Sequence, residues 1–91
     1  RVNALVTVVD PDALRTRARE LDTRWARGEW HGPLHGLPVS QKDLTATRGV
    51  RTTFGSTLFA DHVPQHDALI VRRCASAGAL MIGKSNTPEF G

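Results

Sequence analysis

The 91-residue sequence contains 12 Lys and Arg residues and 9 Asp and Glu residues, so its formal net charge is +3 with neutral histidines. Hydrophobic residues make up 40% and charged residues 23%, which is typical of globular proteins and unlike disordered or collagen-like sequences. No apolar run approaches the roughly 18–20 residues of a membrane span, so we expect a soluble, cytoplasmic protein without membrane contact. The single cysteine, Cys74, excludes an intramolecular disulfide and a zinc site built from several cysteines.

The first half of the sequence predicts a strand, a helix and a second strand. Residues 3–9 are apolar and rich in β-branched side chains, which is typical of a strand buried on both faces. Asp10 can cap a helix that begins at the following proline. Its apolar stripe consists of Leu14, Ala18, Leu21 and Trp25. Gly28 ends this helix, a loop covers residues 29–36, and the second strand is predicted at residues 37–44.

The second half predicts a long connection, a helix and a third strand. Residues 45–65 show no sustained period, and so long a connection is commonly functional in a compact domain, here with a short helical turn at residues 56–60. Asp67 is expected to cap a helix that Gly78 closes. The apolar face of this helix consists of Ile70, Val71, Cys74, Ala75 and Ala77. The third strand is predicted at residues 79–82.

The order β-α-β-α-β, with helical connections, predicts an α/β fold with parallel pairing and right-handed crossovers. Parallel sheets need cover on both faces, and two helices cannot cover both faces of three strands. We therefore expect these residues to be part of a larger α/β/α sandwich with a mixed, largely parallel sheet. Residues 1–91 are interpreted as the N-terminal portion of a single domain, incomplete at the C-terminus and at the N-terminus.

The basic residues do not predict nucleic-acid binding. Five arginines fall in the first helix, where they flank the apolar stripe or point to solvent: Arg15, Arg17, Arg19, Arg24 and Arg27. With three Phe, two Trp and no Tyr, the chain also lacks the aromatic platforms on which single strands stack. We expect no nucleic-acid partner.

Two local motifs suggest ligands but stand in unsuitable contexts. Residues 78–85 match the phosphate-binding pattern G-x-x-x-x-G-K-[ST], which leaves a nucleotide binder as a weak alternative. The predicted helix, however, precedes the first glycine, and an apolar strand separates the two glycines. The histidine pairs His31/His35 and His62/His66 have the spacing of a helical zinc pair, but each pair encloses a proline in a loop. We expect neither a metal nor a cofactor.

Lys42 is one of only two lysines and lies inside a strand-like segment, Pro-Val-Ser-Gln-Lys-Asp-Leu. Strand alternation places it on the same face as Ser40 and on the opposite face from Asp43, so the neighbouring charges are poorly arranged to neutralise each other. Two interpretations are open at this point. Lys42 is an exposed lysine at a strand end, or it is desolvated, which would make it available as a base.

Several blocks of the sequence together resemble the amidase signature family. They are Gly32-Pro33-Leu34-His35-Gly36-Leu37-Pro38-Val39-Ser40-Gln41-Lys42-Asp43-Leu44, then Gly49-Val50, Thr52-Thr53, Gly55-Ser56, Asp67-Ala68, Ala77-Gly78-Ala79, and Ile82-Gly83-Lys84-Ser85-Asn86-Thr87-Pro88-Glu89-Phe90-Gly91. The resemblance spans nearly the whole chain. It implies hydrolysis of a carboxamide C–N bond to a carboxylate and ammonia or an amine by a Ser-Ser-Lys triad, with Lys42 as the general base.

The resemblance also implies what residues 1–91 do not contain. The two triad serines belong to a glycine- and serine-rich segment downstream of the Glu-Phe-Gly block, so residues 1–91 alone are expected to be inactive. Asp43, Asn86 and Thr87 match positions near the lysine and are candidates for supporting it, whereas Lys84 is interpreted as structural. The partner expected for the complete protein is a small-molecule amide, with a homo-oligomer as its assembly. The competing class is a non-catalytic binding protein on the same fold.

Overall fold

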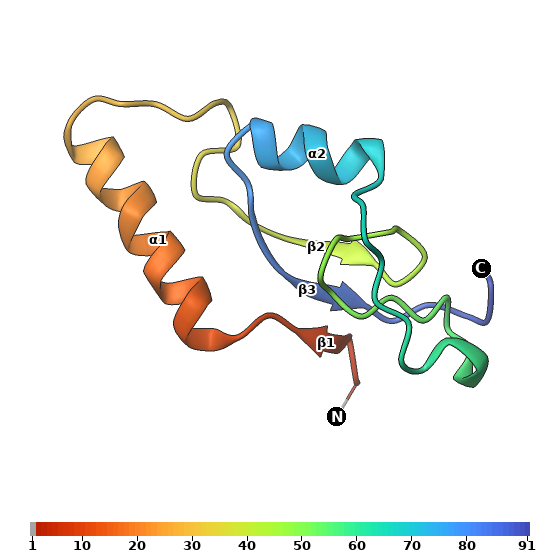
Figure 1. The fold of residues 1–91 in the computed structure, drawn as a ribbon. Helices are drawn as coiled ribbons and strands as arrows, with labels where there is room; N and C mark the ends of the chain where they lie inside the picture. Colours follow the sequence, from red (N-terminus) through yellow and green to blue (C-terminus); the bar gives the residue numbers. More distant parts are fainter. Residues whose placement is uncertain (1) are drawn as a thin grey trace.

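The computed structural model describes residues 2–91 and has an α/β fold (Figure 1). Its elements, in chain order, are β1 (Leu5–Val8), α1 (Pro11–Ala26), β2 (Pro38–Lys42), the 3-10 helix η1 (Thr57–Phe59), α2 (Leu69–Ser76) and β3 (Leu80–Ser85). The predicted order of strands and helices is confirmed, including the helical turn within the long connection. Among the described residues, no helix is long and apolar enough to cross a membrane.

The sheet is mixed, with strand order β1-β3-β2. β2 and β3 are parallel, whereas β1 pairs with β3 in the antiparallel direction. The mixed sheet is as expected, but parallel pairing of the first strand is wrong. The reason is visible in Figure 1: α1 leads away from the sheet instead of running back across it, and the chain turns back only in the loop that follows. β2 therefore enters the sheet against the direction of β1.

β1 is an edge strand and is shorter than predicted. The expectation that it is buried on both faces is wrong, because Val8 is exposed and the other residues of the strand are half-buried. Its close approach to β3 depends on Gly83, where a Cβ atom would lie 2.3 Å from the backbone oxygen of Thr7. Glycine is therefore required at this position by the neighbouring backbone.

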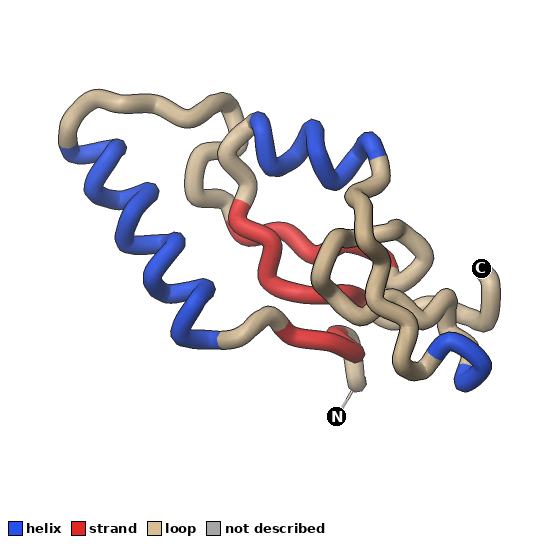
Figure 2. The backbone as a smooth tube through the Cα atoms, viewed as in Figure 1, coloured by secondary structure: helices blue, strands red, loops and turns tan. Residues whose placement is uncertain are grey.

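α1 begins as predicted but is only lightly packed. The carboxylate of Asp10 accepts a hydrogen bond from the backbone N–H of Ala13 at 3.0 Å, which caps the helix. In the predicted apolar stripe, Leu21 is 1% exposed, whereas Trp25 is 62% exposed and packs edge-on against Trp30. Trp25 is thus wrongly assigned to the core, because the helix end that carries it stands away from the sheet (Figure 2).

α2 lies over the sheet, and its N-terminal cap differs from the prediction. Ala68 is the N-cap and supplies no side-chain hydrogen bond, while the Asp67 carboxylate accepts one from the backbone N–H of Arg48 at 2.7 Å. Val71 is buried, but Ile70 is exposed although the sequence pattern places it on the apolar face. Asp67 therefore fastens the long connection to the start of α2 instead of capping the helix.

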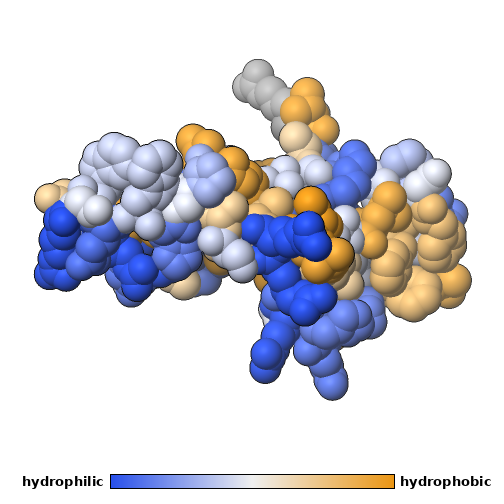
Figure 3. All heavy atoms as spheres, turned by 90° about the horizontal axis from the view of Figure 1, so that it is seen from above, coloured by the Kyte–Doolittle hydropathy of each residue, from blue (hydrophilic) through white to orange (hydrophobic). Residues whose placement is uncertain are grey.

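The long connection between β2 and α2 folds over the carboxyl ends of β2 and β3 (Figure 2). Beyond it, apolar residues gather at the end of the molecule away from α1 (Figure 3). Exposed apolar side chains after β2 include Leu58, Val63 and Phe90. In the described residues the buried hydrophobic side chains are Leu21 and Val71, and the buried polar ones are more numerous. Those polar side chains belong to the carboxyl ends of the two parallel strands and to the connection that follows β2.

Candidate functional site at the carboxyl ends of the parallel strands

The carboxyl ends of β2 and β3 lie side by side because the two strands are parallel. Lys42 stands opposite Ser85 in the register, and the backbone N–H of Asp43 donates to the Ser85 carbonyl at 3.0 Å. Polar groups at this edge of a parallel sheet are the usual place for binding and catalysis in α/β folds. The sequence blocks that contain Lys42 and Asn86 are thereby joined at one edge, although they lie more than forty residues apart.

Lys42 is exposed at the end of β2. Its Nζ donates a hydrogen bond to the backbone oxygen of Asn86 at 2.6 Å, and no second acceptor for it occurs among residues 2–91. The facing side chains explain this exposure, because Val39 and Gln41 turn toward α2 while Ser40 and Lys42 turn away from it. Of the two interpretations left open by the sequence, the exposed strand-end lysine describes this structure, and desolvation of Lys42 is not observed.

Asp43 lies on the opposite face and is 1% exposed, as strand alternation predicts. One carboxylate oxygen accepts from the backbone N–H of Thr53 at 3.1 Å, and the other accepts from the Thr53 hydroxyl. The backbone oxygen of Asp43 also accepts from the N–H of Phe54 at 2.8 Å. Asp43 therefore ties the end of β2 to the returning part of the long connection.

Lys84 is fully buried on the same side as Asp43. Its Nζ donates to the hydroxyls of Thr47 at 2.9 Å and Thr52 at 3.1 Å, and to the backbone oxygen of Thr45. An ammonium group has three N–H donors, and each finds an oxygen here. Burial lowers the pKa of Lys84 below its ordinary value, and the negative charge of Asp43 opposes part of that decrease.

Asn86 and Thr87 continue the chain beyond β3. The Asn86 side-chain oxygen accepts from the backbone N–H of Thr87 at 2.9 Å, while its backbone oxygen holds Lys42. The Thr87 hydroxyl is buried and has no hydrogen-bond partner in the described part of the chain. Among the three predicted supporting residues, Asn86 touches Lys42, Asp43 follows it on the other face, and Thr87 reaches it only through Asn86.

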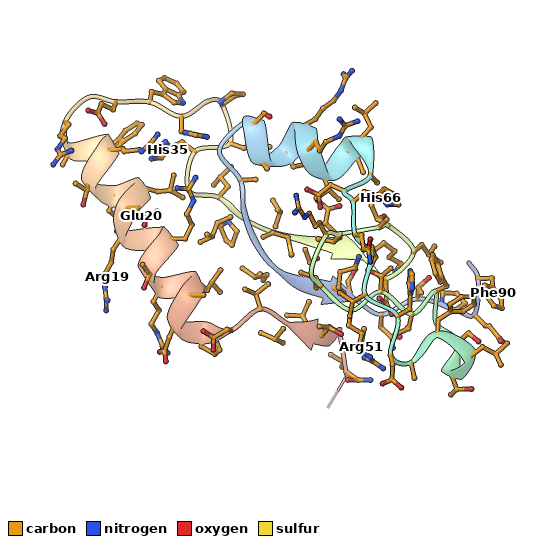
Figure 4. All side chains as sticks on the ribbon, viewed as in Figure 1. Arg19, Glu20, His35, Arg51, His66 and Phe90 are labelled. Carbon is orange, nitrogen blue, oxygen red and sulfur yellow. The ribbon has the colours of Figure 1, made fainter. Side chains whose placement is uncertain are left out.

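A cavity of about 220 Å³ adjoins this edge of the sheet. Asp43, Arg51, Ser56 and Asn86 contribute to its lining. Ser56 is buried, and its hydroxyl accepts from the backbone N–H of Leu58 at 3.2 Å, so it caps η1 as a local turn hydroxyl. Arg51 belongs to the long connection, and Figure 4 shows it on the other side of the molecule from Arg19.

The alternative ligand motifs do not form the sites they suggest. β3 occupies most of residues 78–85, and Lys84 is enclosed by threonines instead of standing at a helix N-terminus, so the phosphate-binding context is absent from this segment. In the first histidine pair, the His31 backbone N–H donates to Nδ1 of His35 at 3.0 Å. Among residues 2–91, no group of three or more His, Cys, Asp and Glu side chains could hold a metal ion.

The surroundings of Lys84 are the feature that the sequence analysis missed. A signal was present, since Lys84 follows an apolar strand segment and the long connection carries several threonines, including Thr47 and Thr52. A lysine on a buried strand needs oxygen acceptors, and threonine hydroxyls in a nearby loop can supply them. Which threonines fold back onto the strand depends on the path of the connection, which has no periodic pattern to predict it.

A family model described as Amidase matches residues 1–91. The chain belongs to the amidase signature family, as its sequence blocks predicted. It is 50% identical to the A subunit of glutamyl-tRNA(Gln) amidotransferase from Moorella thermoacetica, over 99% of this chain and 18% of that protein.

Solved structures agree with this assignment. The native peptide amidase of Stenotrophomonas maltophilia superposes with a TM-score of 0.85 at 38% identity, covering 99% of this chain and 18% of that one. A bacterial aryl acylamidase of the amidase signature enzymes superposes with a TM-score of 0.86 at 29% identity, covering 99% and 19%. The α/β fold is therefore that of amidase signature proteins, and the chain spans about a fifth of the length of the relatives it matches.

Proposed function

We propose that the protein containing these residues hydrolyses a carboxamide to a carboxylate and ammonia or an amine, with Lys42 as its general base. The observation that carries the proposal is family membership together with the position of Lys42 in the matching block, at the carboxyl end of a parallel strand. The open face around Lys42 supports it, because a base must be reachable by the group it deprotonates.

In this proposal a neutral Lys42 accepts a proton that passes through a bridging serine from the nucleophilic serine, which attacks the amide carbonyl. The same proton then goes to the leaving nitrogen as the C–N bond breaks, and water hydrolyses the resulting acyl-enzyme. Both serines are proposed to lie in a glycine- and serine-rich segment that is not among residues 1–91. No metal or cofactor enters this sequence of steps.

The contacts of Lys42 suit such a base. One N–H of the side chain is held by the Asn86 carbonyl at 2.6 Å, so the lone pair of a neutral amine would point away from that oxygen. The backbone on the C-terminal side of Lys42 is held at both its polar groups, since the N–H of Asp43 bonds Ser85 and its carbonyl accepts from Phe54. The amino group of Lys42 can therefore contact another group, while the backbone next to this residue is held by hydrogen bonds.

A second candidate follows from the identities. The chain is 42–50% identical to amidotransferase A subunits but 29–40% identical to the solved amidases. The complete protein would then work as one component of an amidotransferase instead of as a free-standing amidase or a homo-oligomer. Purification of the complete protein from its own cells distinguishes the two, because an amidotransferase component would co-purify with different chains in fixed ratio.

The proposal is tested in the complete protein by ammonia or amine release from a panel of aliphatic, aryl and peptide amides and glutamine. Lys42→Ala is expected to remove nearly all turnover without altering the circular dichroism spectrum. Lys42→Arg is expected not to restore turnover, because a guanidinium stays protonated and cannot accept the proton. Retention of more than about a tenth of the wild-type rate by the Arg variant would contradict the role of Lys42, since loss of a general base lowers rates further than that.

Ser40→Ala is the matched control, because Ser40 is exposed on the same face of β2, two residues before Lys42. We expect it to keep the wild-type rate. Binding of amides without hydrolysis of any of them, by a protein that retains Lys42, would favour the non-catalytic class.

A further inference from the structure

The two faces of the strand ends carry charges that the proposed mechanism uses unequally. Lys42 occupies the open face. The opposite face, which the long connection covers, is called the closed face here; it holds a buried cation, Lys84, and a buried anion, Asp43. We call Lys84 with its three oxygen partners the lysine cage; these partners are the carbonyl of Thr45 and the hydroxyls of Thr47 and Thr52. The mechanism above assigns no task to this cage.

All hydrogen bonds of the cage are formed, and the direction of each is determined by its partners. The Thr47 hydroxyl donates its own proton to the Thr45 carbonyl at 3.1 Å, and the Thr52 hydroxyl donates to the Val50 carbonyl at 3.0 Å. The oxygen lone pairs of both hydroxyls therefore remain for the three N–H groups of Lys84. A neutral amine would leave one of these acceptors without a donor, so the bonding pattern suits the positively charged form.

Asp43 has only uncharged hydrogen-bond partners. Both of its carboxylate oxygens bond to Thr53, and no salt bridge within 4.0 Å joins Asp43 to a cation among the described residues. Its charge acts on Lys84 all the same, because the carboxylate opposes the decrease in the pKa of Lys84 caused by burial. Charges that share a buried region interact over longer distances than charges in water.

We propose that Lys84 is a positioning residue for Lys42: its ammonium balances the buried carboxylate of Asp43 and holds the connection of residues 45–53 against the strand end, so that Lys42 can be neutral. Asp43 is joined to Lys42 by one peptide bond, and without a compensating cation its charge favours the ammonium form of Lys42. The inference rests on the proposed function, because it takes Lys42 as the base.

Other charged and titratable groups face this region from the neighbouring elements. They are Arg48 and Arg51 of the connection, and Asp67 and Cys74 at and in α2. β1 contributes none, since Leu5–Val8 contains no titratable side chain. Arg51 is the cation that lines the same cavity as Asp43, but its hydrogen bonds go to Ala60 and Thr7 and not to the carboxylate.

The test measures kcat/KM against pH in the complete protein, with its best amide substrate. In Lys84→Met we expect kcat/KM at neutral pH to fall at least tenfold. The acid limb of the kcat/KM profile should also move to higher pH by about one unit, because the unbalanced carboxylate of Asp43 favours protonated Lys42. In Asp43→Asn the limb should move to lower pH. In the double variant it should return to within about 0.3 units of the wild type, since both charges are gone.

Lys84→Arg keeps the charge, so its acid limb should stay in place even where the larger guanidinium lowers kcat. Arg19→Gln is the matched control for loss of one positive charge, because Arg19 is exposed on α1 at the other end of the molecule (Figure 4). Its limb should not move, since solvent and salt screen charges at that separation.

A loss of activity in Lys84→Met with an unmoved limb would mean a purely structural lysine and would overturn the inference. If Lys84→Met fails to fold, Asp43→Asn still decides, because an unmoved limb in that variant overturns the charge argument by itself. Full turnover in Lys42→Ala would instead refute the proposed function and this inference with it. An inactive Lys42→Ala combined with unmoved limbs refutes the role of Lys84 alone.

Discussion

Two lysines at neighbouring strand ends have opposite surroundings. Lys42 ends β2 on the open face, where its Nζ bonds one backbone oxygen, and Lys84 stands near the end of β3 on the closed face, where its Nζ bonds three oxygens. In the parallel register Lys84 is opposite Gln41, the residue before Lys42. Because neighbouring residues of a strand point to opposite faces, Lys84 and Lys42 lie on different faces of the sheet. The same side chain is therefore immobilised on one face and left available on the other.

The comparison shows what decides the role of a lysine in this fold. The closed face exists because the long connection returns over the strand ends and brings hydroxyls to Lys84. No described element covers Lys42 in the same way, so its tip can meet another group. Position relative to the connection separates the two lysines, because both are strand-end residues of one sheet.

The strongest way to disturb both faces is to break the pairing of β3 with β1. In Gly83→Ala the added Cβ would lie 2.3 Å from the Thr7 oxygen and 3.2 Å from the Val8 Cα, and both are backbone atoms. We expect a decrease in the free energy of unfolding of about 3 kcal/mol, at the upper end for forced overpacking. Urea denaturation followed by circular dichroism measures it.

Gly28→Ala is the matched control. Gly28 has φ +73° and open space around its Cβ position, so the substitution carries only the backbone penalty of the left-handed region, about 1 kcal/mol. Equal destabilisation by the two variants would show that β1 does not press against Gly83.

The fold was largely predictable from the sequence where periodicity and capping residues act locally. Asp10 caps α1, Gly78 closes α2 with φ +94°, and β2 ends at Lys42 within the predicted segment. The direction of β1 was not predicted, because its nearly continuous apolar run is the pattern of a buried parallel strand, whereas the structure places β1 at an antiparallel edge of the sheet. It depends on where α1 points, which is decided by packing between distant residues.

The two lysines should also differ in how much they contribute to stability. Lys84→Ala leaves the cage oxygens without their donor, so we expect it to decrease the free energy of unfolding by about 2 kcal/mol. Lys42→Ala removes an exposed side chain and should change stability by less than about 0.5 kcal/mol. Urea midpoints of the two variants check this, and a larger loss for Lys42→Ala would reverse the assignment of closed and open faces.

For the candidate site, the sequence identified the open face but not the closed one. The block around Lys42 and the alternation of Lys42 and Asp43 were sufficient to place their side chains on opposite faces. The lysine cage depends on threonines from an aperiodic connection, whose path only the folded chain defines. The same holds for the contact between Lys42 and Asn86, which joins segments distant in the sequence through a backbone oxygen.

The smallest expected effect concerns pH and the stability of the closed face. Burial lowers the pKa of Lys84 in the folded state below its ordinary value of 10.5, so the unfolded chain binds more protons between the two values. Stability should therefore rise as the pH increases from the lowered pKa of Lys84 toward 10.5, because the folded protein no longer has to bury a charge at this position. The chain contains no tyrosine that would titrate in this window and obscure the effect.

Urea midpoints of the wild type at several alkaline pH values up to 10.5 should show this rise. In Lys84→Met the corresponding increase should be absent, since that side chain does not titrate, while Lys42 and Cys74 remain in both proteins. A rise of equal size in the variant would show that the pH dependence comes from another group, and that protonation of the lysine cage is not coupled to folding.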